Sequence, residues 1–285
     1  MTESLNVHYV PTWCPGCGNF GIFTALKKAF ALLDLAPEQT ALVTGIGCSS
    51  KIAQYINTYR IETLHGRTLP VATGVRLANH RLTVIAEGGD GDGMGLGMGH
   101  FIHTARRNLN ITYIIHNNQI YGLTKGQTSP TSDLGAFTKF TPPPRGNVEQ
   151  PVNIVQMALQ AGASFVARST AADSQLADIL AQAISHRGFA VVDILQPCVS
   201  FNHVNTYQWY QERAYRLSTL PDYNPADFAA ASAVAGQWGD KIPTGILYRT
   251  DRPVFEDSLP QLGSGTLLAQ PLQDISVAAL MDELA

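Results

Sequence analysis

Acidic and amide side chains stand where two candidate strands end, the acidic ones within a glycine-rich segment. The segment GGDGDGMGLGMG at 88–99 lies between an apolar strand and a helix. In α/β sheets this is the place where turned backbone N–H groups and a helix N-terminus bind phosphates. Mg²⁺ takes oxygen ligands from few protein groups and completes its octahedron with substrate phosphates. We therefore expect Asp90, Asn118 and the Ile120 carbonyl to hold Mg²⁺ against a diphosphate.

Better-known phosphate and calcium patterns do not fit this segment. Neither G-x-G-x-x-G nor G-x-x-x-x-G-K-[ST] can be spelled in it. A calcium loop counted from Asp90 would put Met94 and Phe101 where oxygen ligands are required. Asp and Asn also form turns after strands, which explains either residue alone. The pair at this spacing favours the metal site, and Asp92 is assigned a second polar contact to the same ligand.

The four cysteines offer a second chemistry. Cys14 and Cys17 form a C-x-x-C pair, whereas Cys48 and Cys198 each stand alone after an apolar strand. A close pair before a helix fits a thioredoxin-like redox site. Structural zinc sites usually have two close ligand pairs, and this sequence has one. Thiolates from separate strand ends suit an iron–sulfur cluster, while lone cysteines are commonly small buried side chains. The spacing leaves these alternatives open.

Strands that alternate with helices must position these residues. The expected strands span 41–45, 82–87, 111–117, 164–169 and 189–195. The expected helices span 18–35, 94–107, 151–161 and 173–186. This alternation predicts an α/β fold, with a mostly parallel sheet covered by helices on both faces.

The later part of the chain has a weaker pattern. The proline-rich stretch 141–151 predicts an extended loop. Beyond it, only a short helix near 226–237 and a strand at 245–249 are expected. We therefore predict an α/β domain at 1–200 and an irregular C-terminal extension at 201–285 that packs on the core or on a partner.

Composition excludes some partners and suggests another. The 285-residue chain has a formal charge of −3, so it lacks the basic surface that nucleic acid or an anionic membrane would need. Only 14% of its residues are charged, against about 25% in typical soluble domains. This shortage predicts a surface partly covered by another subunit. The sequence shows no signal peptide or membrane-spanning run, so a cytoplasmic location is expected.

Several motifs together resemble one family. GDG, 25 intervening residues and then NN resembles the thiamine-diphosphate motif of transketolases and pyruvate decarboxylases. More closely, this segment, WCPGCGNFGI, GIGCSSK and LHGRTLPVATGVRLAN resemble the β subunit of 2-oxoacid:ferredoxin oxidoreductases over about residues 10–200. The resemblance implies a thiamine-diphosphate-binding fold with Mg²⁺ and one 4Fe–4S cluster. It assigns the cluster to Cys14, Cys17, Cys48 and Cys198.

The resemblance also implies cofactor contacts, a reaction and partners. The expected thiamine-diphosphate contacts are Ile46, Gly47, Cys48, Ser49, His65, Gly91, Asp92, Gly122 and Leu123. His65 is also a catalytic candidate, although a loop histidine bonded to backbone explains it equally well. In the family a 2-oxoacid is decarboxylated and oxidised, coenzyme A takes the acyl group, and ferredoxin receives the electrons. A heterodimer doubled by symmetry is expected.

One part of a thiamine enzyme has no candidate in this sequence. Such enzymes need a glutamate beside the aminopyrimidine, and Glu62 and Glu87 stand in the wrong context. The resemblance implies that an α or fused γ/α chain supplies it. A non-catalytic electron-transfer subunit that only retains the phosphate-binding loop is the alternative, but it would not need the paired GDG and NN motifs or LHGR.

Two lysines bear on the substrate. Lys51 and Lys125 follow loops expected to flank the thiazolium, and we assign them to the substrate tail. Pyruvate would leave both cations unpaired in a partly dry site, whereas 2-oxoglutarate offers a distal carboxylate. The prediction is therefore 2-oxoglutarate, with either reaction direction. The alternatives are pyruvate or a broad range of 2-oxoacids, with lysines that face water or bind coenzyme A phosphates.

Overall fold

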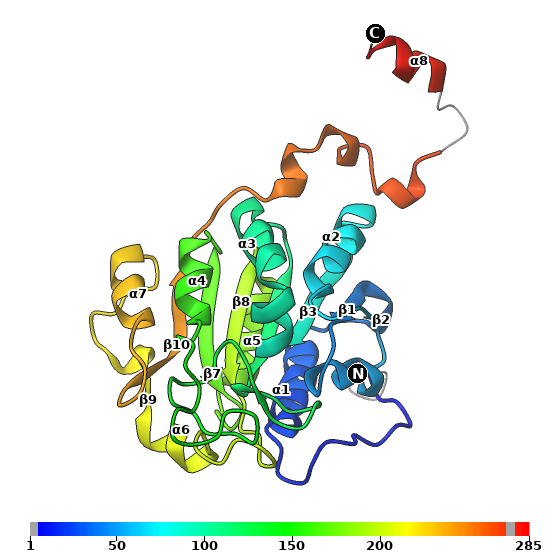
Figure 1. The fold of residues 1–285 in the computed structure, drawn as a ribbon. Coiled ribbons are helices and arrows are strands. Elements are labelled where there is room, and N and C mark those ends of the chain that lie inside the picture. The colour runs from blue at the N-terminus through cyan, green and yellow to red at the C-terminus, as the bar shows by residue number, and fades with distance from the viewer. Residues whose placement is uncertain (1–4, 272–276, 285) are drawn as a thin grey trace.

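An eight-stranded sheet forms the centre of the protein in the computed structural model, which describes residues 5–271 and 277–284 (Figure 1). The strand order is β2-β1-β3-β4-β8-β7-β10-β9, and every pair is parallel except β10 with β7. The strands are β1 Thr40–Thr44, β2 Tyr59–Glu62, β3 Thr83–Gly89, β4 Thr112–Asn117, β7 Phe165–Thr170, β8 Ala190–Leu195, β9 Ala214–Arg216 and β10 Ile242–Arg249. The predicted mostly parallel α/β sheet is confirmed.

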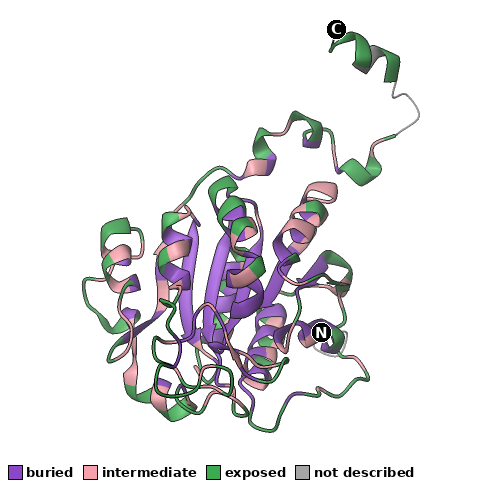
Figure 2. Ribbon diagram, viewed as in Figure 1, coloured by how far each residue is buried: buried purple, intermediate pink, exposed green. Residues whose placement is uncertain are grey.

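The central strands are buried on both faces. Every residue of β4 and β8 is buried, and Figure 2 shows the sheet as the most continuously buried part of the molecule. Continuous apolar, β-branched runs such as AVVDIL form such strands because a parallel sheet is covered by helices on each side. Their carboxyl ends then emerge together at one edge.

Helices cover the two faces in separate groups. On one face, α1 Asn19–Leu32 and α5 Leu176–Ser185 pack on one hydrophobic cluster with residues of β1, β3, β4 and β8. The second cluster lies on the opposite face. Its helices are α2 Thr68–Ala78, α3 Met98–Arg107, α4 Ile154–Gln160 and α7 Phe228–Ala235. The predicted coverage of both faces is therefore confirmed.

Several elements were not predicted, for identifiable reasons. Strand β2 is short and largely exposed at the sheet edge, so it lacks an apolar signature. Helix α2 contains Pro70 and Gly74, both poor helix formers, although a proline is tolerated in a first turn. Helix α3 begins at Met98 because a π-helical turn, Asp92–Leu96, precedes it. The short helix α6 Tyr207–Arg213 was not predicted either.

The chain beyond residue 200 is built into the core more closely than its sequence pattern indicates. The predicted helix and strand there correspond to α7 and β10, and β10 with β9 extends the main sheet. Residues 250–271 carry the 3-10 turns Phe255–Ser258, Pro260–Leu262 and Leu267–Ala269, and α8 Val277–Asp282 lies away from the sheet in Figure 1. The division at residue 200 stays a prediction.

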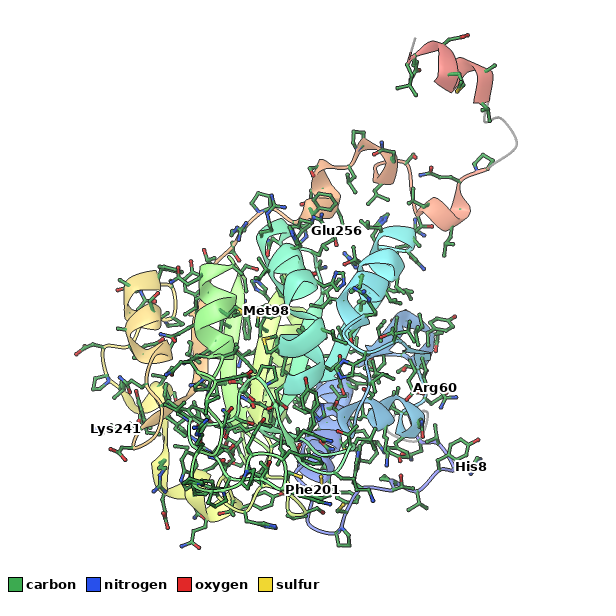
Figure 3. The ribbon with its side chains drawn as sticks, in the orientation of Figure 1. His8, Arg60, Met98, Phe201, Lys241 and Glu256 are labelled. Atoms are coloured by element: carbon green, nitrogen blue, oxygen red, sulfur yellow. The ribbon has the colours of Figure 1, made fainter. Side chains whose placement is uncertain are left out.

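One buried ion pair ties this last segment to the body. The guanidinium of Arg76 donates to Glu256 at 2.6 Å, and the backbone N–H of Asn110 donates to the same carboxylate at 3.1 Å. Figure 3 shows Glu256 on the opposite side of the body from Phe201, which follows the carboxyl end of β8. Within residues 5–271 and 277–284, no helix has both the length and the apolarity to cross a bilayer.

Replacing Gly21 tests the packing of α1. An added Cβ there would lie 2.1 Å from the carbonyl oxygen of Ala171, just after β7. We expect Gly21→Ala to lower the free energy of unfolding by about 1–3 kcal/mol through overpacking. The matched control is Gly74→Ala in α2, where an added Cβ meets nothing within 4 Å. It should raise stability by about 0.5–1 kcal/mol, because alanine favours helix over glycine.

Denaturant midpoints of the wild type and the two variants check this expectation. A midpoint for Gly21→Ala at or above that of the wild type would contradict the packing described for α1.

Candidate functional site

A pocket lies where the carboxyl ends of β1, β3 and β4 meet. Its walls come from the loops after these three strands, from the loop after β2 and from the glycine-rich segment. The residues predicted to contact thiamine diphosphate all line it: Ile46, Gly47, Cys48, Ser49, His65, Gly91, Asp92, Gly122 and Leu123. The three predicted metal-site residues Asp90, Asn118 and Ile120 line it too. The structure thus brings together segments that are far apart in sequence.

Asp90 forms the floor of this pocket and is almost completely buried. One of its oxygens accepts hydrogen bonds from the Ser129 and Thr131 hydroxyls, at 2.5 and 2.6 Å. The other accepts from the backbone N–H of Asn118 at 3.3 Å, so the two predicted ligands are neighbours. Burial raises the pKa of Asp90 despite these donors. A divalent cation would supply the positive charge that a carboxylate this deep requires.

The donor chemistry around Asp90 fits Mg²⁺. The Asn118 side-chain oxygen accepts from the backbone N–H of Ile120 at 3.1 Å, and the backbone N–H of Asn118 donates to Asp90. In the described part of the chain, no three His, Cys, Asp or Glu side chains come together to hold a single metal ion. Mg²⁺ does not need such a group, because amide, carbonyl and phosphate oxygens complete its shell.

Asp92 holds two loops together through its carboxylate, and it also lines the pocket. One carboxylate oxygen accepts from the backbone N–H groups of Ile46 and Gly66, at 3.1 and 2.8 Å. The other accepts from the Thr68 hydroxyl at 3.1 Å, and His65 Nδ1 lies 3.6 Å from the first oxygen. Asp92 therefore fixes the loops after β1 and β2 against each other. Its expected polar contact with the cofactor stays a prediction.

A buried Glu–His pair lies behind the pocket. Glu87 is fully buried in β3, and its carboxylate lies 3.4 Å from Nε2 of His116 in β4. The other ring nitrogen of His116 pairs with the side-chain oxygen of Asn19 at 2.8 Å, the first residue of α1 and two beyond Cys17. Burial raises the pKa of Glu87. Polar letters inside the apolar runs VIAEGG and YIIHN were the sequence signal for this pair.

Other pocket residues were not predicted. Gly89, His116, Tyr121 and Thr124 line the pocket beside the expected set. Tyr121 packs on the glycine-rich segment: its hydroxyl donates to the Gly91 carbonyl at 3.0 Å, and a Cβ on Gly91 would come 2.3 Å from its ring. Gly91 is thus required by close packing. A tyrosine in the loop after the NN motif gave no sign of this partner.

The four cysteines are free thiols that gather beside the pocket. Cys17 is buried, Cys48 and Cys198 are half-buried, and Cys14 is exposed. The pKa of Cys17 is raised to about 11, chiefly by burial and to a smaller extent by the three other thiols. Gly122 packs between two of them, since a Cβ there would lie 3.5 Å from the Cys198 sulfur and 3.8 Å from that of Cys48. This donor set fits an iron–sulfur cluster, whose several atoms hold their ligands farther apart than one ion does.

The two predicted substrate lysines do not line the pocket. Lys51 donates to the Thr12 hydroxyl at 3.3 Å, and Lys125 is exposed. Each stands near a lining residue, because Lys51 is two residues beyond Ser49 and Lys125 follows Thr124. Their contact with substrate stays a prediction.

Comparison with known proteins agrees with this geometry. Residues 45–194 match the family described as thiamine pyrophosphate enzyme, C-terminal TPP binding domain. Residues 198–264 match the family of the C-terminal part of the pyruvate ferredoxin oxidoreductase beta chain. Over 277 residues the chain is 45% identical to 2-oxoacid:ferredoxin oxidoreductase 1, subunit beta, of Aeropyrum pernix, a match that spans 93% of this chain and 86% of that one.

Two further relatives carry more specific names. One is 2-oxoglutarate oxidoreductase subunit KorB of Mycobacterium tuberculosis, 46% identical over 67% of this chain and 51% of that one. The other is a solved structure, 2-oxoglutarate:ferredoxin oxidoreductase from Magnetococcus marinus with 2-oxoglutarate, coenzyme A and succinyl-CoA bound. It has a TM-score of 0.89 and 37% identity, and the match covers 100% of this chain and 95% of that one.

Asp92→Ala tests the linking role of this carboxylate. We expect it to lower the free energy of unfolding by at least about 2 kcal/mol, because two backbone N–H groups and a hydroxyl lose a charged acceptor. Asp92→Asn keeps one acceptor oxygen and should cost less. Hydrogen exchange at the Ile46 and Gly66 amides should quicken in the alanine variant. Unchanged exchange at both amides would show that Asp92 does not hold these loops.

Proposed function

We propose a reaction for this chain from one premise: the chain belongs to the β subunits of the 2-oxoacid:ferredoxin oxidoreductases. The proposal is that it holds thiamine diphosphate, Mg²⁺ and one 4Fe–4S cluster. With a partner chain it would decarboxylate and oxidise 2-oxoglutarate, passing the acyl group to coenzyme A and electrons to ferredoxin. The observation that carries the proposal is the single pocket that gathers the loops after β1, β2, β3 and β4 beside the four thiols.

The floor of the pocket supports the diphosphate end of the cofactor. Asp90 and Asn118 would hold Mg²⁺ with side-chain oxygens, and Ile120 with its carbonyl. The hydroxyls of Ser129 and Thr131 already fix the Asp90 carboxylate, so its second oxygen is held in place as well. When bound, thiamine diphosphate supplies a carbon nucleophile and an electron sink for decarboxylation.

The thiols beside the pocket support an electron acceptor for the same reaction. Cys48 belongs to both places, because it lines the pocket and its sulfur interacts with those of Cys14 and Cys198. A cluster held there would lie close enough to the cofactor to take electrons singly. Reduced thiols of this kind suit the cytoplasmic location that we propose.

The lack of a glutamate among the described residues of the pocket lining supports a partner chain. Glu87 faces His116 in the core. Glu62, at the end of the edge strand β2, accepts a hydrogen bond from the side chain of Gln54. We propose that an α or fused γ/α chain supplies the pyrimidine-side glutamate and completes the site.

Support for 2-oxoglutarate comes from the relatives and from the two lysines assigned to the substrate. The Mycobacterium tuberculosis relative is named for 2-oxoglutarate, and the similar solved structure is named for it and has it bound. Lys51 and Lys125 are close in sequence to lining residues, and we propose that one of them pairs with the distal carboxylate. A broader 2-oxoacid range or pyruvate is the second candidate, because other relatives are named only for 2-oxoacids and one matched family for pyruvate.

Two substitutions should separate the two cofactors. Asp90→Ala should weaken thiamine diphosphate binding at least about 100-fold through loss of Mg²⁺. Replacing even a residue that only supports the metal ligands lowers metal affinity by about 10–100-fold. The Asp90→Ala variant should keep its iron. Cys198→Ser should lose iron and ferredoxin reduction but still bind thiamine diphosphate. Retained affinity in Asp90→Ala, or full iron and activity in Cys198→Ser, would refute the corresponding assignment.

The chain alone should be catalytically silent. Without a partner's glutamate, we expect no 2-oxoacid-dependent ferredoxin reduction by the purified, fully loaded chain. Adding the partner chain should restore turnover. Steady-state turnover by this polypeptide in the absence of any second chain would reject the partner requirement.

Lys125→Ala tests the substrate assignment. The wild-type complex should prefer 2-oxoglutarate over pyruvate in kcat/KM, and the variant should lose about tenfold of that preference with the charge-assisted contact. The control is Lys139→Ala, an exposed lysine outside the pocket lining, which should leave the ratio unchanged. Equal wild-type use of both acids, or an unchanged ratio in Lys125→Ala, would contradict the role given to the lysines.

A further inference from the structure

One buried glutamine lies between the two proposed cofactor sites. Gln196 directly follows β8 and is 1% exposed. Its side-chain oxygen accepts from the amide nitrogen of Asn118 at 2.9 Å. Its amide nitrogen donates to the sulfur of Cys17 at 3.3 Å. A single amide group therefore contacts a proposed Mg²⁺ ligand on one side and a proposed cluster ligand on the other.

The orientation of this amide is fixed by the backbone. The Gln196 nitrogen also donates to the carbonyl oxygen of Pro197 at 2.8 Å. A carbonyl can only accept, so the nitrogen must face Pro197 and the oxygen must face Asn118. Both hydrogens of the amide are then used, one on Pro197 and one on Cys17.

This orientation determines which atom Asn118 offers to the metal. Because Gln196 presents an oxygen, Asn118 must turn its NH₂ group toward it. The Asn118 side-chain oxygen consequently points away from Gln196 and accepts from the backbone N–H of Ile120, another residue that lines the pocket where Mg²⁺ is proposed. With the opposite orientation, Asn118 would present donors to a cation.

The same amide polarises the Cys17 sulfur. Hydrogen bonds to cluster sulfurs favour the more negative, reduced cluster and so raise its reduction potential. The loop that carries Cys17 is packed for this contact: a Cβ on Gly18 would come 2.8 Å from the Gln196 side chain. The Gly18 N–H also donates to the Pro197 carbonyl, at 3.2 Å.

We infer that Gln196 is a positioning residue for both cofactors, which orients the Asn118 oxygen toward Mg²⁺ and donates a hydrogen bond to a cluster thiolate. This inference rests on the proposed function. It adds a residue outside the pocket lining whose one side chain sets metal affinity and cluster potential together.

Two near-isosteric substitutions separate these effects. Gln196→Met removes both the acceptor for Asn118 and the donor to Cys17. Gln196→Glu keeps an acceptor oxygen toward Asn118 but replaces the amide that donates to the sulfur. Gln160→Met, an exposed glutamine at the end of α4, is the control. Each protein is purified anaerobically with its partner chain.

Two readouts other than activity report the result. The Mg²⁺ concentration for half-maximal thiamine diphosphate binding should rise about tenfold or more in Gln196→Met, and little in Gln196→Glu. The cluster midpoint potential, from EPR-monitored redox titration, should become more negative in both variants. Gln160→Met should change neither quantity.

The contradicting outcomes are distinct. Wild-type potential and wild-type Mg²⁺ dependence in both Gln196 variants would overturn the inference, even if their turnover fell. Wild-type protein without iron or without thiamine diphosphate binding would overturn the proposed function, and the inference with it.

Discussion

A carboxylate buried at the edge of a parallel sheet needs hydrogen-bond donors or a cation inside the protein, and the residues around Asp90 are arranged to supply them. The parallel order of β1, β3 and β4 brings their carboxyl ends to one edge, where Asp90 is almost fully enclosed. Two hydroxyls from the loop beginning at Ser129 donate to one of its oxygens, and the N–H of Asn118 to the other. A partial positive environment is thus built before any cation binds.

A series of hydrogen bonds through neutral amide groups connects Asp90 to the cysteines. Asn118 neighbours Asp90, Gln196 orients Asn118, and Gln196 contacts Cys17, so each step is set by which atom can donate. A separate carboxylate, Asp92, holds the loops after β1 and β2 against the glycine-rich segment. The two proposed cofactor sites therefore share one hydrogen-bonded frame. These hydrogen bonds would hold the proposed thiamine diphosphate site and the proposed cluster site next to each other.

Much of this arrangement could be predicted from the sequence, because it rests on local signals. Long apolar runs predicted β4 and β8, and the GDG and NN motifs placed Asp90 and Asn118 at adjacent strand ends. Contacts that depend on packing could not be predicted. Gln196 has no motif of its own, Tyr121 meets Gly91 only in the folded chain, and α2 was hidden by Pro70 and Gly74. The hydrogen bonds of Asp92 could not be predicted either, because its partners come from loops over 20 residues away in sequence.

The central claim is that one pocket edge serves thiamine diphosphate and an iron–sulfur cluster together. The most direct measurement is the cofactor content of the protein purified anaerobically with its partner chain. We predict about one thiamine diphosphate and about four irons for each copy of this chain. Iron without thiamine diphosphate in the assembled complex would contradict this claim, and would indicate a protein that only carries electrons.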